Sequence, residues 1–139
     1  MTMHYTLLDH TADLKIRITG KDPADLFKNA GLALFDLIVD PQTVTPEKEI
    51  AIRVGGADRA DLMVNYLREL LYLWTGDENL INMIDIGDIS ESDLDARIAV
   101  GRYIPGRHEI AHEIKAVTYH QIEVSRTPKG WQATVVLDI

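Results

Sequence analysis

The residues with the clearest potential for chemistry lie at the two ends of the chain. The sequence closes with Asp138 and Ile139, which places a side-chain carboxylate beside a terminal one. Near the other end, the segment DHTAD puts Asp13 just before an alternating apolar run. Carboxylates held close together repel one another unless a proton, a lysine or a cation neutralises them. Oxygen ligands in a chain without cysteine suit calcium, magnesium or manganese better than zinc.

Two predicted strands must position these acids. The run from 114 to 139 reads IKAVTYHQIEV, SRTPKG and WQATVVLDI, a pattern typical of an antiparallel hairpin around a turn. Its second strand ends at the last residue, so we expect Asp138 to be held in place rather than frayed. The run LKIRITG alternates, which leaves Asp13 on the polar face. If these strands are neighbours, the carboxylates converge. The alternative, which spacing alone favours, is that Asp13 and Asp138 are solvated acids at strand ends.

Lys115 is the cation that the hairpin is expected to bring near. Alternation puts Lys115, Val117 and Tyr119 on one face of the first strand and His120 on the opposite, apolar face. Matching polar faces places Asp138 opposite Val117, with Lys115 on the diagonal at about 7–8 Å. A slip of two residues would keep the faces but move Lys115 away. Lys115 as a merely solubilising charge, and Tyr119 as a contact residue or a cross-strand pair, remain alternatives.

The histidines are weaker candidates. His10 is either a ligand or, as we favour, part of a turn in DHTAD. His108 and His112 have helical i,i+4 spacing, but the Pro-Gly just before them disfavours a helix. His120 is expected to be a hydrogen-bonded core residue. A Ser-His-Asp order, a glycine-rich phosphate loop and an HExxH motif are all missing from the sequence, so an autonomous enzyme has little support.

The remaining elements predict the fold class. Asp22 and Asp58 each have the sequence context of a helix N-cap, followed by helices that are expected to end near Val39 and at Gly76. Alternating or apolar segments predict further strands at 5–8, 49–56, 80–89 and 94–101. The pattern indicates an α+β fold in which two helices pack against one mainly antiparallel sheet. The strand–helix–strand order occurs twice, without evident sequence self-similarity.

The composition limits the classes of function. A length of 139 residues predicts a single domain over 1–139. The sequence has 14 Lys and Arg against 22 Asp and Glu, a formal net charge of −8, so no direct nucleic-acid grip is expected. The lack of cysteine, of a long apolar run and of a signal-peptide pattern predicts a cytoplasmic protein that does not enter membranes.

Four segments of the sequence resemble the archease family, in the same order and over essentially the whole chain. They are DHTADLKIRITG, DLFKNAGLALFDLI, HEIKAVTYHQIEV and WQATVVLDI. The resemblance implies a compact α+β fold with a strand-helix-strand-strand module. It also implies a small cytosolic, non-enzymatic activator of the GTP-dependent tRNA-splicing and RNA-repair ligase usually called RtcB. Such activators are described as promoting guanylylation of the ligase on its active-site histidine and its multiple turnover.

The family's functional residues carry over to the positions already singled out. The resemblance implies that Asp13, Asp138 and the carboxylate of Ile139 bind a divalent metal, with calcium expected and magnesium or manganese as alternatives. It assigns the functional lysine to Lys115. The loop before the last hairpin departs from the family pattern, because it reads Gly101-Arg102 where relatives often have glycine followed by an acid. If that loop contacts the ligase, the preference for a partner differs.

Two functions from other classes stay open. One is a stand-alone metal-dependent hydrolase with Asp13 and Asp138 as metal ligands and His10 or His120 as the base. The other is a general chaperone or interaction module that uses the face carrying Val117 and Tyr119.

Overall fold

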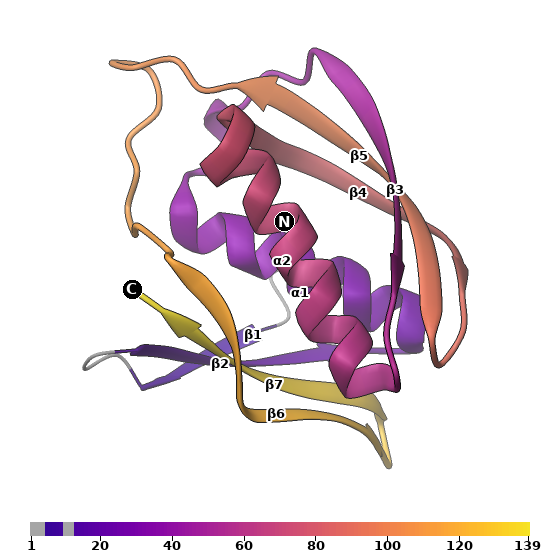
Figure 1. The fold of residues 1–139 in the computed structure, drawn as a ribbon. Helices are drawn as coiled ribbons and strands as arrows, with labels where there is room; N and C mark the ends of the chain where they lie inside the picture. Colours follow the sequence, from indigo (N-terminus) through magenta and orange to yellow (C-terminus); the bar gives the residue numbers. More distant parts are fainter. Residues whose placement is uncertain (1–4, 10–12) are drawn as a thin grey trace.

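The computed structural model of the protein describes residues 5–9 and 13–139, which form two helices, a short 3-10 turn and two β-sheets (Figure 1). In the described part, no helix is both long and apolar enough to cross a membrane. The elements in chain order are β1 (Tyr5–Asp9), β2 (Asp13–Gly20), α1 (Pro23–Ile38), η1 (Pro41–Thr43), β3 (Lys48–Gly55), α2 (Arg59–Asp77), β4 (Asn79–Ile89), β5 (Asp93–Arg102), β6 (Ala116–Thr127) and β7 (Gly130–Asp138).

The two helices lie between two antiparallel sheets. One sheet has the order β1-β2-β7-β6 and the other β3-β5-β4. Helix α1 packs on β2 and β7 of the first sheet and on β4 of the second, while α2 packs on β6, β3 and β4 (Figure 1). The α+β class is therefore confirmed. The expectation of a single sheet was wrong, because each helix is covered on two sides.

The sequence of α1 explains why one sheet is not enough to cover it. Adjacent pairs such as Phe27 with Leu26, and Leu34 with Phe35, are all buried although their side chains leave the helix in different directions. A helix that is apolar on most of its circumference must be covered on more than one side. At Gly31 the covering elements come very close, since a Cβ built there would lie 2.5–2.7 Å from the side chains of Ile84, Leu70 and Tyr66.

The entry into each helix is built from one repeated motif. The pattern G-x-D-x-A-D-L-x-x-N occurs at 20–29 and again at 56–65. In both copies the first aspartate accepts a 2.8 Å hydrogen bond from the N–H of the second. The second aspartate accepts one from the residue after the glycine, at 2.9 and 2.8 Å. The closing asparagine donates, at 2.9 Å in both copies, to the carbonyl of the residue before the glycine. The expectation of no self-similarity was therefore wrong.

The repeated motif marks two copies of a strand-helix-strand-strand unit. One unit is continuous, β3-α2-β4-β5, and its strands pair in the order β3-β5-β4. The other is β2-α1 followed, after the whole first unit, by β6-β7, and its strands pair in the matching order β2-β7-β6. One unit is thus inserted into the other. As a result, the last strand of the chain pairs with a strand near its beginning.

The end of α2 differs from the prediction by a few residues. Gly76 was expected to end the helix but lies within it, and the left-handed position is taken by Glu78, at φ 55°. The N–H of Glu78 bonds to the carbonyls of Leu73 and Trp74. Because Asn79 already belongs to β4, the pairing of β4 with β5 fixes where the helix stops.

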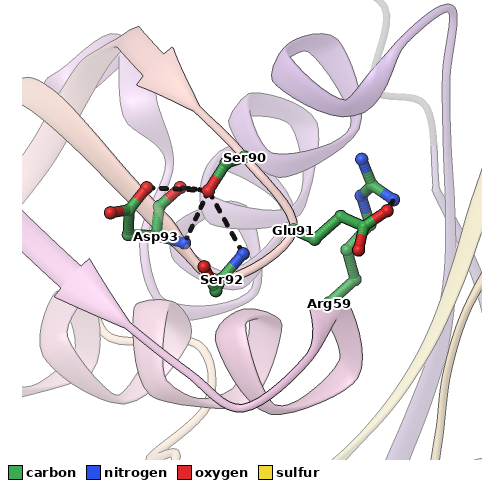
Figure 2. Close-up of polar contacts among 5 residues, drawn as sticks. All are labelled: Arg59, Ser90, Glu91, Ser92 and Asp93. Carbon is green, nitrogen blue, oxygen red and sulfur yellow. Dashed lines mark hydrogen bonds and ion pairs between the residues drawn. The ribbon is translucent and has the colours of Figure 1, made fainter.

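The turn of the β4–β5 hairpin is tied together by one serine (Figure 2). The hydroxyl of Ser90 donates to Asp93 Oδ1 at 2.8 Å and accepts from the N–H groups of Ser92 and Asp93 at 3.2 and 3.1 Å. Beside it, Glu91 lies 3.5 Å from Arg59, the one ion pair within residues 5–9 and 13–139. This contact holds the hairpin tip against the start of α2, so we assign this acidic turn a structural role.

Candidate metal and partner site

The strands carrying Asp13 and Asp138 are direct neighbours. Strands β2 and β7 pair antiparallel with Asp13 opposite Asp138. Residues opposite one another in an antiparallel pair point to the same face, with Cβ atoms about 4.5–5.5 Å apart. The register is consistent with the buried faces, because Leu14 and Leu137 are opposite each other in the core. The predicted meeting of the two chain ends is therefore present, and both aspartates are solvent-exposed.

The electrostatics at this sheet end are unfavourable for the protein alone. Two carboxylates directly opposite each other repel, and within the described residues neither Asp13 nor Asp138 forms an ion pair. Ile139, which follows Asp138, is partly buried against the core. Across the same part of the chain, no cluster of three or more His, Cys, Asp or Glu side chains occurs. The two aspartates therefore offer side-chain carboxylate oxygens, the kind of donor that suits a hard, partly hydrated cation.

Lys115 lies beside Asp138, but in a different register from the prediction. The Cα partner of Asp138 is Ala116 and not Val117. The backbone N–H of Lys115 donates to the carbonyl of Asp138 at 2.7 Å. The side chain of Lys115 is exposed just before β6 begins. The lysine is thus fixed next to the aspartate pair through its backbone, and its ammonium group is turned to solvent.

A bulge in β6 is the reason for the shifted register. Thr118 pairs with Val136, and the next pair is Glu123 with Thr134, so β6 advances five residues while β7 advances two. Between these two pairs β6 therefore contains an odd number of extra residues. An odd number exchanges which side chains of β6 point to each face of the sheet before and after the bulge. Gln121 within the bulge has a φ of 54°. The predicted faces are right after the bulge and wrong before it, where Val117 is buried instead of lying on the exposed face.

The bulge also changes the roles of two residues inside it, Tyr119 and His120. His120, expected in the core, is exposed. Tyr119 is neither a simple cross-strand pair nor a free contact residue, because its hydroxyl donates to Asp61 Oδ1 of α2 at 2.6 Å. The guanidinium of Arg68 lies 4.7 Å from the centroid of its ring. The hydrogen bond lowers the pKa of Asp61 and raises that of Tyr119. Tyr119 therefore fastens β6 to α2.

Both ring nitrogens of His108 are used in contacts away from the aspartates. His108 is buried, its Nδ1 accepts from the N–H of Ile104 at 2.9 Å, and its Nε2 lies 2.9 Å from the carbonyl of Thr43. Since a carbonyl can only accept, Nε2 carries the proton. Both ring nitrogens are engaged, and His108 ties the loop after β5 to η1. His10 lies outside the described residues.

Gly101 and Arg102, expected in a loop, are the last two residues of β5, and the glycine is tightly packed. A Cβ at Gly101 would lie 2.2 Å from the carbonyl oxygen of Thr45, so this position has no room for a side chain. The N–H of Arg102 donates to Glu47 at 3.1 Å. Beyond these residues the connection from β5 to β6 borders a groove of about 810 Å³ whose lining includes Lys115. The sequence analysis did not identify this groove, because residues from separate elements build it.

Comparison with known proteins gives one consistent result. The family model described as the archease protein family matches residues 5–139. Proteins called protein archease from Methanosarcina mazei and Methanopyrus kandleri are 38% and 34% identical, over 97% and 99% of this chain and 95% and 100% of their own length. The solution structure of Methanobacterium thermoautotrophicum protein 1598 has a TM-score of 0.82 at 28% identity, and the match covers 99% of this chain and 100% of that one.

Proposed function

The chain belongs to the archease family, and on this premise we propose that it is a non-enzymatic activator of an RtcB-type RNA ligase. In this role it promotes guanylylation and multiple turnover of the GTP-dependent ligase during tRNA splicing and RNA repair in the cytosol. The observation that carries the proposal is the direct pairing of Asp13 with Asp138, with Lys115 fixed beside them. Two exposed aspartates that repel each other and form no ion pair with any residue that the structure describes do not stabilise the fold, but together with the adjacent lysine they are a suitable contact for a partner.

We assign a divalent cation to Asp13, Asp138 and the carboxylate of Ile139, with calcium expected and magnesium or manganese as alternatives. The donor set supports the assignment, since all its donors are oxygens and both aspartates are solvent-exposed. So few protein ligands would leave coordination positions for water or for a partner's groups. When bound, the ion supplies positive charge that offsets the repulsion of the carboxylates and favours nearby phosphate.

The chain's own residues then act by position and charge. We propose that the aspartate pair approaches the basic mouth of the ligase active site, where carboxylates alone would repel a triphosphate. The exposed ammonium group of Lys115 binds the GTP phosphates from the archease side. The net charge of −8 supports action on the ligase protein rather than on RNA.

Guanylylation of the ligase, measured with and without this protein, tests the proposal. We expect Asp138→Asn and Lys115→Ala to fold normally and to reduce the stimulation by about 10- to 100-fold, as changes around metal sites commonly do. Asp85→Asn and Lys48→Ala remove the same charges from exposed positions of the other sheet and should leave stimulation intact. Full stimulation by Asp138→Asn and Lys115→Ala would refute the mechanism.

Two further measurements separate this proposal from the other classes of function. Isothermal titration with Ca²⁺, Mg²⁺ and Mn²⁺, without ligase, should show one site that Asp138→Asn abolishes. Nucleotide turnover by the protein alone would indicate the hydrolase instead. Stabilisation of unrelated proteins, undiminished by Asp138→Asn, would indicate a general chaperone.

A further inference from the structure

The groove that is lined by Lys115 also contains aromatic and acidic residues from other elements. Its volume is about 810 Å³, and it runs between the end of α2 and the connection that leads from β5 to β6. Trp74 and Glu78 line it on the helix side, and Tyr103, Glu113 and Lys115 line it on the connection. Trp74 and Glu78 thus come from the end of α2, Tyr103 follows β5, and Lys115 lies at the other end of the connection, just before β6.

The aromatic side of the groove is rigidly built. The rings of Trp74 and Tyr103 meet edge to face, with centroids 5.2 Å apart and an interplanar angle of 75°. The N–H of Tyr103 donates to the carbonyl of Glu78 at 3.0 Å, which ties the connection to the end of the helix. Both rings are partly exposed. An exposed indole face is the best aromatic surface for a cation.

The electrostatics of this helix end favour a cation from outside the chain. A helix carries partial negative charge at its C-terminus, which basic residues normally offset. The last turn of α2 has no basic residue, and it ends in Asp77 followed by Glu78. Glu113 adds a third carboxylate to the groove side. The lining of the groove therefore carries two carboxylates, those of Glu78 and Glu113, against one cation, Lys115.

We propose that this groove recognises an arginine side chain on a basic segment of the partner protein. Guanidinium is the cation that fits both features, because it can stack on Trp74 while it donates paired hydrogen bonds to a carboxylate such as that of Glu78. A lysine ammonium can make the ion pair but not the planar stack. The chain's net charge of −8 attracts such a segment from a distance.

The groove also leads toward the proposed activation site. Lys115 lines it and donates its N–H to the carbonyl of Asp138. A segment held at Trp74 would therefore direct the partner toward the aspartate pair. This part of the inference rests on the proposed function, since the partner there is the RNA ligase. Recognition of arginine by the groove can be tested without any ligase.

The test is an NMR titration of the full chain with the peptide acetyl-Gly-Arg-Gly-amide. The matched probe carries citrulline, which has nearly the same shape as arginine but no charge. We expect the arginine peptide to shift the Trp74 indole N–H and the Tyr103 amide saturably, with Kd on the order of millimolar, and the Trp131 indole to stay unchanged. Equal shifts with citrulline, or shifts confined to other regions, would overturn the proposal.

Variants make the assignment specific. Trp74→Leu keeps apolar bulk without a π face and should weaken peptide binding about five-fold. Glu78→Gln changes an exposed position and covers the case in which Trp74→Leu fails to fold; it should weaken binding similarly. Glu49→Gln removes the same charge from β3 and should have no effect. Unchanged binding by Glu78→Gln and Trp74→Leu would refute recognition in this groove.

The same variants separate this inference from the proposed function. If wild-type protein fails to stimulate the ligase yet binds the arginine peptide in the groove, the proposed function falls and the recognition stands. If stimulation is normal and both the peptide and the ligase bind Glu78→Gln as they bind wild type, the groove inference alone falls.

Discussion

Removing the same hydroxyl from two tyrosines should change stability in opposite directions. Tyr66 is fully buried, and its hydroxyl has no hydrogen-bond partner among the described residues. Burial accordingly raises the pKa of Tyr66. The hydroxyl of Tyr5, in contrast, donates to Asp36 Oδ2 at 2.5 Å, and burial together with this bond raises its pKa. Tyr66→Phe should stabilise the protein, and Tyr5→Phe should destabilise it.

The expected changes in the free energy of unfolding depend on whether each hydroxyl oxygen has a hydrogen-bond partner. An unsatisfied buried polar group costs about 1–3 kcal/mol. Phenylalanine at Tyr66 removes that cost and forfeits only the dispersion contacts of one atom, a few tenths of a kcal/mol. We therefore expect a gain of about 1 kcal/mol, or a rise in Tm of roughly 3 °C. Tyr5→Phe loses a hydrogen bond to a carboxylate at a partly exposed position and should cost about 1 kcal/mol.

Urea unfolding followed by tryptophan fluorescence provides the assay. The midpoint should rise for Tyr66→Phe and fall for Tyr5→Phe, while the slope m stays constant, because the area exposed on unfolding is unchanged. A loss of 1 kcal/mol or more in Tyr66→Phe would refute the reasoning, since it would mean that the hydroxyl has a partner such as a bound water. A shift of the same sign in both variants would refute it as well.

Two other changes have definite expected outcomes. Gly31→Ala should destabilise by about 1–3 kcal/mol despite better helix propensity, because the new Cβ would lie 2.5 Å from Ile84 Cδ1 and 2.7 Å from both Leu70 Cδ1 and the Tyr66 hydroxyl oxygen. In urea unfolding, the part of the loss due to the hydroxyl should disappear in a Tyr66→Phe background. Tyr119→Phe should lower Tm at pH 7, because its hydroxyl depresses the pKa of Asp61. A depressed pKa stabilises the fold above the unfolded value near 4 and stops doing so as pH falls through the folded value. The difference in Tm between wild type and Tyr119→Phe should therefore shrink as Asp61 becomes protonated at acid pH, and a difference that stays constant as the pH is lowered would contradict this account.

Local chemistry made the helix starts predictable, and one end of the sheet in part. Asp22 and Asp58 cap their helices as predicted, because an N-cap needs only its own side chain and an N–H three residues on. The meeting of Asp13 and Asp138 was a conditional prediction: alternation puts both acids on polar faces, but it specifies neither that the two strands are neighbours nor a register that excludes a two-residue slip. The N-caps and the alternation within each strand are each contained in a few consecutive residues.

The errors arose where tertiary context overrides such signals. The bulge around Gln121 has no glycine or asparagine to mark its positive φ, so an unbroken strand was the natural prediction. That single irregularity misplaced Val117 and His120. The second sheet, in contrast, did have a signal. Apolar residues on several sides of α1 indicated two covered faces, and the repeated motif at its start matched that of α2.

The insertion of one unit into the other connects the fold to both proposed sites. Strand β2 and its partner β7 are separated in the sequence by the whole inserted unit of β3, α2, β4 and β5. The Asp13–Asp138 pair is therefore a contact between residues far apart in the chain. The groove is built where the units join, from the end of the inserted helix and from the connection that returns the chain to β6. Lys115 is the last residue of that connection, and its backbone N–H donates to the carbonyl of Asp138. A change in the length of the connection should therefore disturb arginine recognition and ligase activation together, although it touches neither sheet.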